Sequence, residues 1–122
     1  MPATESSFES IPLRDLDAMS ERERDALPVG VVGFGADTTV QTYNATEARL
    51  SGLDPATVVG VPFFEVVAQC MNNFMVAQRF EDEAELDDIV PYVLTLRMRP
   101  TKVRLRLLAT AGILRRYVLI ER

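Results

Sequence analysis

One run near the C-terminal end alternates between cationic and apolar side chains. Its positions, in order, are Lys102, Val103, Arg104, Leu105, Arg106 and Leu107. Successive side chains of a β-strand point to opposite faces of a sheet, so a period of two predicts a strand over residues 101–108. One face of that strand is expected to be exposed to solvent and the other buried. The rest of the chain must therefore supply partner strands and a layer that covers the apolar face.

Four further segments have the composition of strands. They are residues 29–34, 39–43, 91–98 and 115–121. Short turn segments separate the strands on each side of the long middle section, which is the typical spacing of antiparallel hairpins. Only the connection from residue 43 to residue 91 is long, and its pattern is helical. The sequence predicts an α+β fold, with a five-stranded antiparallel sheet and helices packed on one face, which is the plan of a PAS domain.

Capping residues divide the long connection into short helices. Asn44 is a favourable N-cap, and Glu47 follows it at the position of a capping box. The simplest interpretation of Glu47 is therefore that it partners Asn44 at a helix cap. Asp54 followed by Pro55 opens a second short turn of helix. Several short helices, rather than one continuous one, are expected between residues 44 and 60.

One longer helix is expected after the middle of the chain. Asn72 or Asn73 can cap a helix that runs to about Leu86. Its apolar positions are expected to face inward and its acidic positions outward. These apolar positions are Phe74, Met75, Ala77 and Phe80.

The N-terminal part differs from the sheet-forming part. Residues 1–12 are polar and contain two prolines, which predicts a loose arm. Residues 13–27 suggest one or two short helices, in which Ser20 and Glu23 have the spacing of a capping box. We therefore expect an N-terminal arm and helical cap over residues 1–27 and the PAS domain over residues 28–122.

Composition excludes several kinds of chemistry. The 122 residues contain no histidine and one cysteine, Cys70, so neither an imidazole base nor an internal disulfide is available. A histidine- or cysteine-rich metal site is excluded for the same reason. No apolar run approaches the roughly 20 residues of a membrane span, and the polar N-terminus does not resemble a signal peptide. We expect a cytoplasmic protein that is not an enzyme, and no metal or membrane as a partner.

Charge is unevenly distributed along the chain. Residues 81–88 carry six acids and no base, whereas residues 97–122 carry eight Arg or Lys against one acid. A basic sheet face can indicate nucleic-acid binding. The net charge of −5 and the adjacent acidic run argue against it. Solvated faces of opposite sign, which attract each other or a partner, are the simpler interpretation.

Cys70 ends the apolar segment that begins at Pro62. A lone cysteine is most often a small buried apolar residue. A thiol that reaches an activated acyl group can instead form a thioester, and only Cys70 offers one here. The residues alone leave both interpretations open.

Several motifs in order resemble the photoactive yellow protein family, whose members are bacterial PAS-fold blue-light receptors. The motifs are Tyr43-Asn44-Ala45-Thr46-Glu47, Ser51-Gly52-x-Asp54-Pro55, Val58-x-Gly60, Phe63-Phe64-x-x-Val67-Ala68-x-Cys70 and Met98-x-Pro100-Thr101-Lys102-Val103. The resemblance covers about residues 26–107.

The resemblance implies a chromophore and its binding residues. It implies p-coumaric acid (4-hydroxycinnamic acid) linked to Cys70 as a thioester. It makes Tyr43 and Glu47 the phenol-binding pair, with Glu47 as the proton donor in signalling. Ser51 stands where the family has a threonine that supports the tyrosine hydroxyl. Ala68 and Met98 match positions near the chromophore.

The sequence also departs from the family pattern. Leu53 replaces an arginine that shields the chromophore, and Gln69 and Met71 flank the cysteine where the family has proline and threonine. Leu94 and Leu96 occupy aromatic positions of the family. The alternative is a non-photoactive PAS module that binds a ligand or another protein. In either case we expect a signalling protein as partner, and residues 1–27 or the sheet could serve a homodimer.

Overall fold

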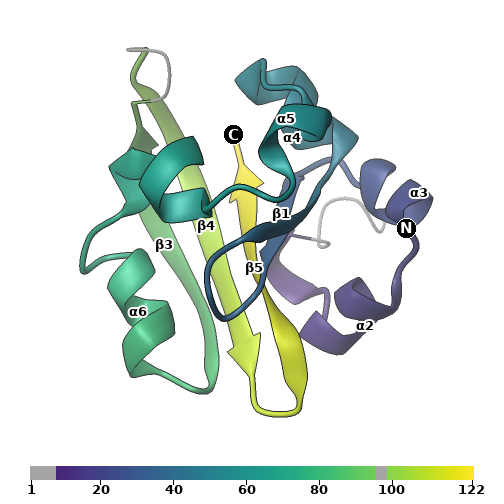
Figure 1. The fold of residues 1–122 in the computed structure, drawn as a ribbon, viewed down its shortest axis with the longest axis vertical. Helices are drawn as coiled ribbons and strands as arrows, with labels where there is room; N and C mark the ends of the chain where they lie inside the picture. Colours follow the sequence, from purple (N-terminus) through teal and green to yellow (C-terminus); the bar gives the residue numbers. More distant parts are fainter. Residues whose placement is uncertain (1–7, 96–98) are drawn as a thin grey trace.

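Five antiparallel strands form one sheet in the computed structural model, which describes residues 8–95 and 99–122. The strands are β1 (Gly30–Phe34), β2 (Val40–Tyr43), β3 (Leu86–Leu94), β4 (Thr101–Thr110) and β5 (Ile113–Glu121). Their spatial order is β2-β1-β5-β4-β3 (Figure 1). The two hairpins that bracket the sheet are thus joined through β5, which pairs with both β1 and β4. The predicted α+β class with five antiparallel strands is confirmed.

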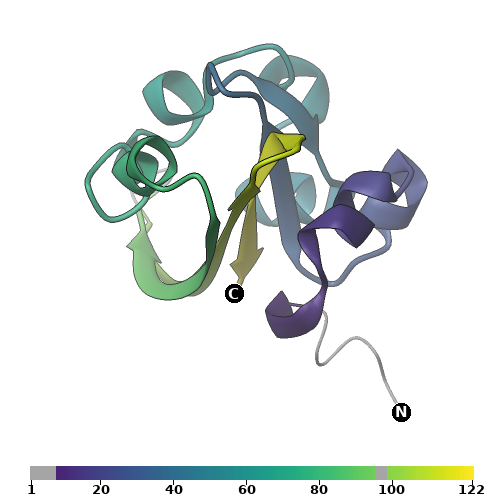
Figure 2. The same cartoon turned by 90° about the horizontal axis from the view of Figure 1, so that it is seen from below.

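Short helices cover both faces of this sheet. They are α2 (Leu13–Ala18), α3 (Glu21–Asp25), α4 (Ala45–Ser51), α5 (Pro55–Val58) and α6 (Ala77–Asp82), with a π-helical turn at Phe63–Val67 and a 3₁₀ turn at Gln69–Met71. Figure 2 shows α2 and α3 on the opposite side of the sheet from the helical segments of the long connection. No helix within residues 8–95 and 99–122 is long and apolar enough to cross a bilayer.

Alternation along the strands produces two apolar cores. Val32 and Leu107 contribute to the core under the long connection, whereas their neighbours Val31 and Leu108 belong to the core under the N-terminal helices. Because successive strand residues point to opposite faces, each core receives every second residue of a strand. The sheet is therefore buried on both faces over much of its area.

Four aromatic rings anchor the long connection to the sheet. Phe34 on β1 stacks on Phe63 at 5.9 Å between ring centroids and meets Phe64 and Phe80 edge-on at 5.3 and 5.1 Å. Offset and edge-to-face contacts in this range add about 0.5–1.5 kcal/mol each beyond the area they bury. This cluster fixes the π-helical turn, and with it the segment that leads to Cys70.

The expected long helix is wrong. α6 spans only Ala77–Asp82, and β3 begins at Leu86, five residues before the predicted Pro91. The side chain of Asn73 accepts hydrogen bonds from the backbone N–H groups of Met75 and Val76, and this local turn precedes the helix. Met75 and, most of all, Phe74, which is 78% exposed, lie at the surface and do not face inward as expected.

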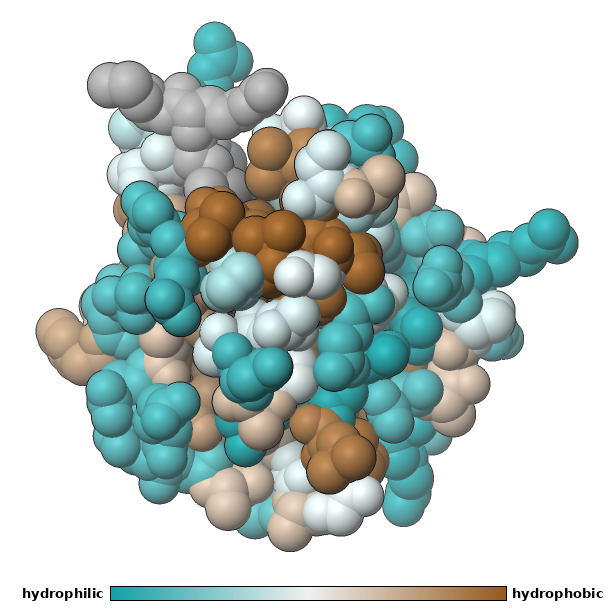
Figure 3. Space-filling model, viewed as in Figure 1, coloured by the Kyte–Doolittle hydropathy of each residue, from teal (hydrophilic) through white to brown (hydrophobic). Residues whose placement is uncertain are grey.

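Apolar side chains also reach the surface on the face of the molecule covered by the long connection. Figure 3 shows brown patches on this face over the π-helical turn and the chain that leads into it. Val66, in the π-helical turn, and Val59, which follows α5, are among the exposed large apolar residues. The irregular connection thus covers the core less completely than a continuous amphipathic helix would.

The N-terminal segment is not a loose arm where the structure describes it. Residues 8–10 are helical, and Phe8 is fully buried. Arg106, expected on a wet face, is buried instead: it donates to the carbonyl oxygens of Phe8 (3.2 Å) and Ile11 (2.8 Å) and pairs with Asp87 at 2.8 Å. The period of two is correct for β4, but the N-terminal segment covers the second face. The guanidinium group of Arg106 satisfies backbone carbonyls there.

Candidate ligand-binding site

Asn44 organises the local structure around the site. Its side-chain oxygen accepts hydrogen bonds from the N–H groups of Glu47 and Val31, and its amide nitrogen donates to the carbonyls of Arg24 and Val29. The predicted N-cap is confirmed, and it also ties α4 to β1 and α3. A fully satisfied buried amide of this kind specifies one arrangement of its neighbours. It fixes Glu47 in the first turn of α4, facing the sheet.

Tyr43 and Ser51 form a buried hydroxyl pair. Tyr43 ends β2, Ser51 ends α4, and their hydroxyl oxygens lie 2.9 Å apart. Gly52 then ends the helix in the left-handed conformation, with φ of 79°, a geometry that glycine adopts without strain. The turn places the Ser51 hydroxyl at the end of the tyrosine side chain.

Glu47 forms a buried ion pair with Arg122. The carboxylate is 1% exposed, and Nη1 and Nη2 of Arg122 donate to Oε1 and Oε2 at 2.6 and 3.1 Å. The simplest interpretation of Glu47, as the capping-box partner of Asn44, is wrong: the Asn44 N–H donates to the carbonyl oxygen of Val31. The side chain of Glu47 therefore makes no capping-box hydrogen bond and pairs with Arg122 instead.

Gly30 makes room for this carboxylate. A Cβ atom at this position of β1 would lie 2.1 Å from Oε1 of Glu47 and 3.1 Å from its Cδ. No side chain larger than hydrogen fits between β1 and the carboxylate in this arrangement. A glycine inside a strand often marks such a close approach.

Burial changes the proton affinity of two groups at the site. It raises the pKa of Glu47, while the hydrogen bonds and positive charge of Arg122 act in the opposite direction without cancelling the effect of burial. Burial, with a smaller contribution from the charge of Glu47, raises the pKa of Tyr43 to about 12. Tyr43 therefore remains a hydroxyl donor at physiological pH, and Glu47 is easier to protonate than an exposed carboxylate.

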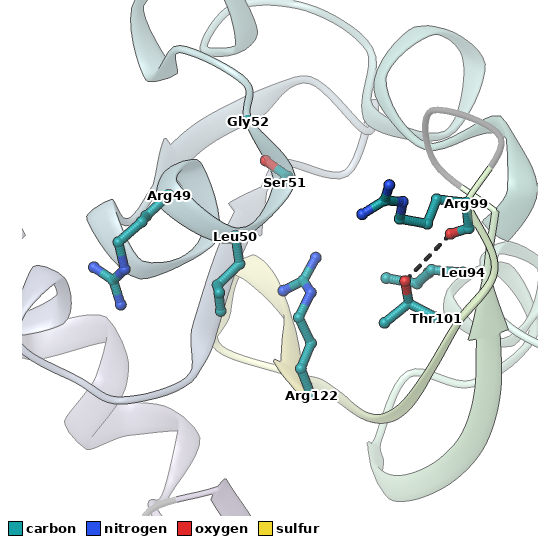
Figure 4. A pocket seen from close by; sticks show the side chains of 8 residues that line it. All are labelled: Arg49, Leu50, Ser51, Gly52, Leu94, Arg99, Thr101 and Arg122. Atoms are coloured by element: carbon teal, nitrogen blue, oxygen red, sulfur yellow. Dashed lines mark hydrogen bonds between the residues drawn. The ribbon is translucent and has the colours of Figure 1, made fainter.

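A pocket of about 450 Å³ opens beside these groups. It is lined by Arg49, Leu50, Ser51, Gly52, Leu94, Arg99, Thr101 and Arg122. Figure 4 shows Arg122 and Arg99 extending into the pocket from the strand side, with Ser51 at the end of the helix opposite them. The lining includes three arginines and no acid. The pocket is suited to an anionic or strongly polar group.

Cys70 lies on a different element. It belongs to the 3₁₀ turn Gln69–Met71, and its carbonyl oxygen accepts hydrogen bonds from the Tyr92 hydroxyl and from the side-chain amide of Asn73. Its side chain is half-buried and packs against the core that contains Tyr43 and Ala68. Ala68 is buried, and Met98 lies outside the described residues. The thiol and the hydroxyl pair thus border one core, although Cys70 does not line the arginine-rich pocket.

Hydrogen-bonding groups gather beside one apolar core. The Tyr43 and Ser51 hydroxyl groups contact each other, the buried Glu47 carboxylate pairs with Arg122, and a half-buried thiol packs against the core that contains Tyr43. Such donors stabilise an anionic oxygen where water is excluded. Among the described residues, no group of three or more acidic or cysteine side chains could hold a metal ion.

Sequence reasoning missed two residues of the site. Arg122 lies 75 positions from Glu47, and they meet because β5 pairs with β1 and α4 packs against β1. Gly30 could have been suspected, because a glycine at the start of an apolar strand often marks a close contact. Its partner could not be identified without the tertiary structure.

Comparison with known proteins identifies the class of this domain. Residues 24–120 match a family model for the PAS fold. A PAS domain of an HTR-like protein from Haloarcula marismortui, 17% identical, superimposes with a TM-score of 0.67 over 89% of this chain and 98% of that one. The molecule is a PAS domain.

Relatives of higher sequence identity assign the domain to one family of PAS proteins. The photoactive yellow protein of Halochromatium salexigens is 34% identical over 92 residues, which is 73% of this chain and 74% of that protein. The photoactive yellow protein domain of the sensor histidine kinase Ppr from Rhodospirillum centenum is 33% identical, with a TM-score of 0.82 over 89% of this chain and 98% of that one. The chain belongs to the photoactive yellow protein family.

Proposed function

We propose that this protein is a blue-light photoreceptor that carries p-coumaric acid as a thioester on Cys70. The observation that carries the proposal is the buried cluster of Tyr43, Ser51 and Glu47, which borders the core against which the only thiol packs. Membership of the photoactive yellow protein family supports the same chromophore. The absence of histidine from the sequence argues against the common enzymatic alternatives.

The residues have distinct roles in this proposal. Cys70 holds the acyl end, while the hydroxyl group of Tyr43 and the carboxyl group of Glu47 donate to the phenolate end. Ser51 orients Tyr43 through the 2.9 Å contact between their hydroxyl oxygens. Ala68 is a buried wall near the thiol, and Met98 is proposed as a further wall. When bound, p-coumaric acid would supply visible absorption and a double bond that light isomerises.

Glu47 is suited to release a proton in response to light. Burial raises its pKa, so a nearby phenolate would keep it neutral and able to donate a hydrogen bond. Once its proton passes to the phenolate oxygen, a charged carboxylate remains next to a packed core, and Arg122, which contacts both carboxylate oxygens, offsets part of that cost. The part of the cost that Arg122 does not offset would favour a conformational change in the domain.

The signal is proposed to reach a bacterial cytoplasmic signalling protein. The PAS domain is a signalling module, and one structural relative is a domain of a sensor histidine kinase. The segment from Phe8 onward packs against the second face of the sheet. Its release is the output in this proposal, and it requires the contacts at Arg104 and Arg106 and the burial of Phe8 to be lost together. A homodimer through this segment or the sheet stays a proposal.

Incubation with the anhydride of p-coumaric acid tests the attachment. We expect intact mass to increase by one coumaroyl group, with a new absorption band that bleaches in blue light and recovers in the dark. Cys70→Ala should show neither change, and Glu47→Gln should retain the adduct but alter the band and its recovery. A wild-type protein whose thiol reacts with a general thiol reagent yet takes no coumaroyl group would refute the proposal.

A second candidate is a PAS module that binds a different ligand or a protein. The observation that favours it is the Glu47–Arg122 pair, which engages the carboxylate with a cation. Leu94 also lines the pocket in place of an aromatic residue of the family pattern, and Leu53 stands at the family's arginine position. Binding of small carboxylates to the Cys70→Ala protein, with no coumaroyl adduct on the wild type, would support this candidate.

A further inference from the structure

We propose that Arg122 is the positioning residue that sets whether Glu47 carries a proton, and that it supplies the positive charge at the phenol end of the site. The second half of this inference rests on the proposed function, whereas the first half concerns the protein without any ligand. Arg122 touches neither thiol nor acyl group in the proposal, so it acts through Glu47.

The geometry of the pair carries the inference. Both guanidinium Nη atoms of Arg122 meet both carboxylate oxygens of Glu47, at 2.6 and 3.1 Å. The side chain of Arg122 is 17% exposed and that of Glu47 is 1% exposed, so the pair is shielded from water mainly on the carboxylate side. Two-point contact fixes the orientation of a carboxylate as well as its charge.

Arg122 also faces the pocket. It follows β5, and Figure 4 shows its side chain directed toward the end of α4. It thus both contacts the buried carboxylate of Glu47 and lines the arginine-rich pocket. By contrast, Leu53 at the turn after α4 packs against the apolar core and brings no charge to the site. Arg122, which follows β5, therefore supplies the positive charge that the turn after α4 lacks.

No other described charge competes for Glu47. From β2 the carboxylate faces Tyr43, which is uncharged below its pKa of about 12. From β1 it faces Gly30, which has no side chain. The further cations of the pocket, Arg49 and Arg99, are among its lining residues, but the charged contacts described for Glu47 are those with Arg122.

Removal of Arg122 should therefore leave only burial to act on Glu47, and burial favours the neutral acid. In the protein with bound chromophore, the loss of a cation should also destabilise the phenolate. Both groups should bind their protons more tightly. An opposite charge at this distance changes proton affinity by about tenfold or more, so the effect is measurable.

Infrared spectroscopy of the ligand-free protein tests the first half. At neutral pH, Arg122→Gln should gain the C=O band of a protonated carboxylic acid, and Glu47→Gln in the same background should remove it. Arg122→Lys should restore the carboxylate in part. Arg49→Gln, which removes a charge from the same pocket without touching Glu47, is the matched control and should show no new band.

A pH titration of the coumaroyl adduct tests the second half. The transition between phenol and phenolate absorption should move to higher pH in Arg122→Gln, by about tenfold in proton concentration or more. Arg122→Lys should lie between this variant and the wild type. An unchanged titration and no new infrared band in Arg122→Gln would overturn the inference. If the wild type forms no adduct, the proposed function fails, and the infrared result alone decides the role of Arg122.

Discussion

Substitution of Gly30 by alanine should disrupt the site without touching any of its functional side chains. The added Cβ would lie 2.1 Å from Oε1 of Glu47 and 3.2 Å from its Cβ. The first contact is far shorter than two atoms tolerate, so the carboxylate must turn away from β1. Because the same oxygen accepts the 2.6 Å hydrogen bond from Arg122, this movement breaks the ion pair.

The expected cost follows from the burial of the pair. Removal of one partner from a buried ion pair costs about 3–5 kcal/mol. Arg122 is partly exposed and keeps some hydration when left alone, which favours the lower end of that range. The alanine also stiffens the unfolded chain, which offsets about 0.4–1 kcal/mol. The free energy of unfolding should therefore fall by about 2–3 kcal/mol, or about 1 M in the urea midpoint.

A double-mutant cycle identifies the cause. Gly30→Ala is measured by urea denaturation in the wild type and in a Glu47→Ala background, where the clashing carboxylate is absent. The cost should fall sharply in that background, because only the 3.2 Å contact with the Cβ of residue 47 remains, giving an interaction energy of about 2 kcal/mol. If Gly30→Ala costs the same in both backgrounds, the strand itself rejects the side chain, and the proposed close approach to Glu47 is refuted.

Three further predictions concern the site and its support. Tyr43 has a pKa of about 12 when folded against an ordinary value of 10.0, so its contribution to stability is complete below pH 10 and is lost as the pH rises through 12; Tyr43→Phe should reduce the alkaline loss in a denaturation series, and an identical series would contradict this. Phe80→Ala should lower the free energy of unfolding by about 3–5 kcal/mol, whereas Phe74→Ala should change it by less than about 0.5 kcal/mol, because only Phe80 is buried. Equal costs in thermal denaturation would show that Phe74 is packed after all. Arg106→Lys cannot reproduce the guanidinium contacts to the carbonyl oxygens of Phe8 and Ile11, so limited proteolysis should cut the N-terminal segment faster than in the wild type. An unchanged rate would show that these contacts do not hold the segment.

Local signals in the sequence predicted the elements whose cause is local. Asn44 and Ser20 were recognised as caps, because a side-chain oxygen three residues before a free N–H group needs no distant partner. The period of two over residues 101–108 likewise predicted β4. By contrast, the composition of residues 72–86 suits a helix, yet the side chain of Asn73 and the start of β3 at Leu86 leave room for only six residues of α6.

The second face of β4 shows a different limit. Arg106 has the pattern of a solvated residue, and nothing in its neighbourhood indicates that the segment around Phe8 will cover it. A long cationic side chain can lie against apolar surface and use its head group to satisfy buried carbonyls. Whether it does so depends on what packs above it, which lies 98 positions away in the sequence.

The sequence by itself determined the succession of strand segments along the chain, the cap that places Glu47 in the first turn of α4, and the family to which the chain is similar. Each follows from spacing within a short stretch or from motifs in a fixed order. Only the tertiary structure decided that Glu47 meets Arg122 and that Gly30 leaves space for the carboxylate. The physical reason is that sheet pairing brings together residues 75 positions apart, and the energy of a buried charge depends on those neighbours rather than on its own sequence context.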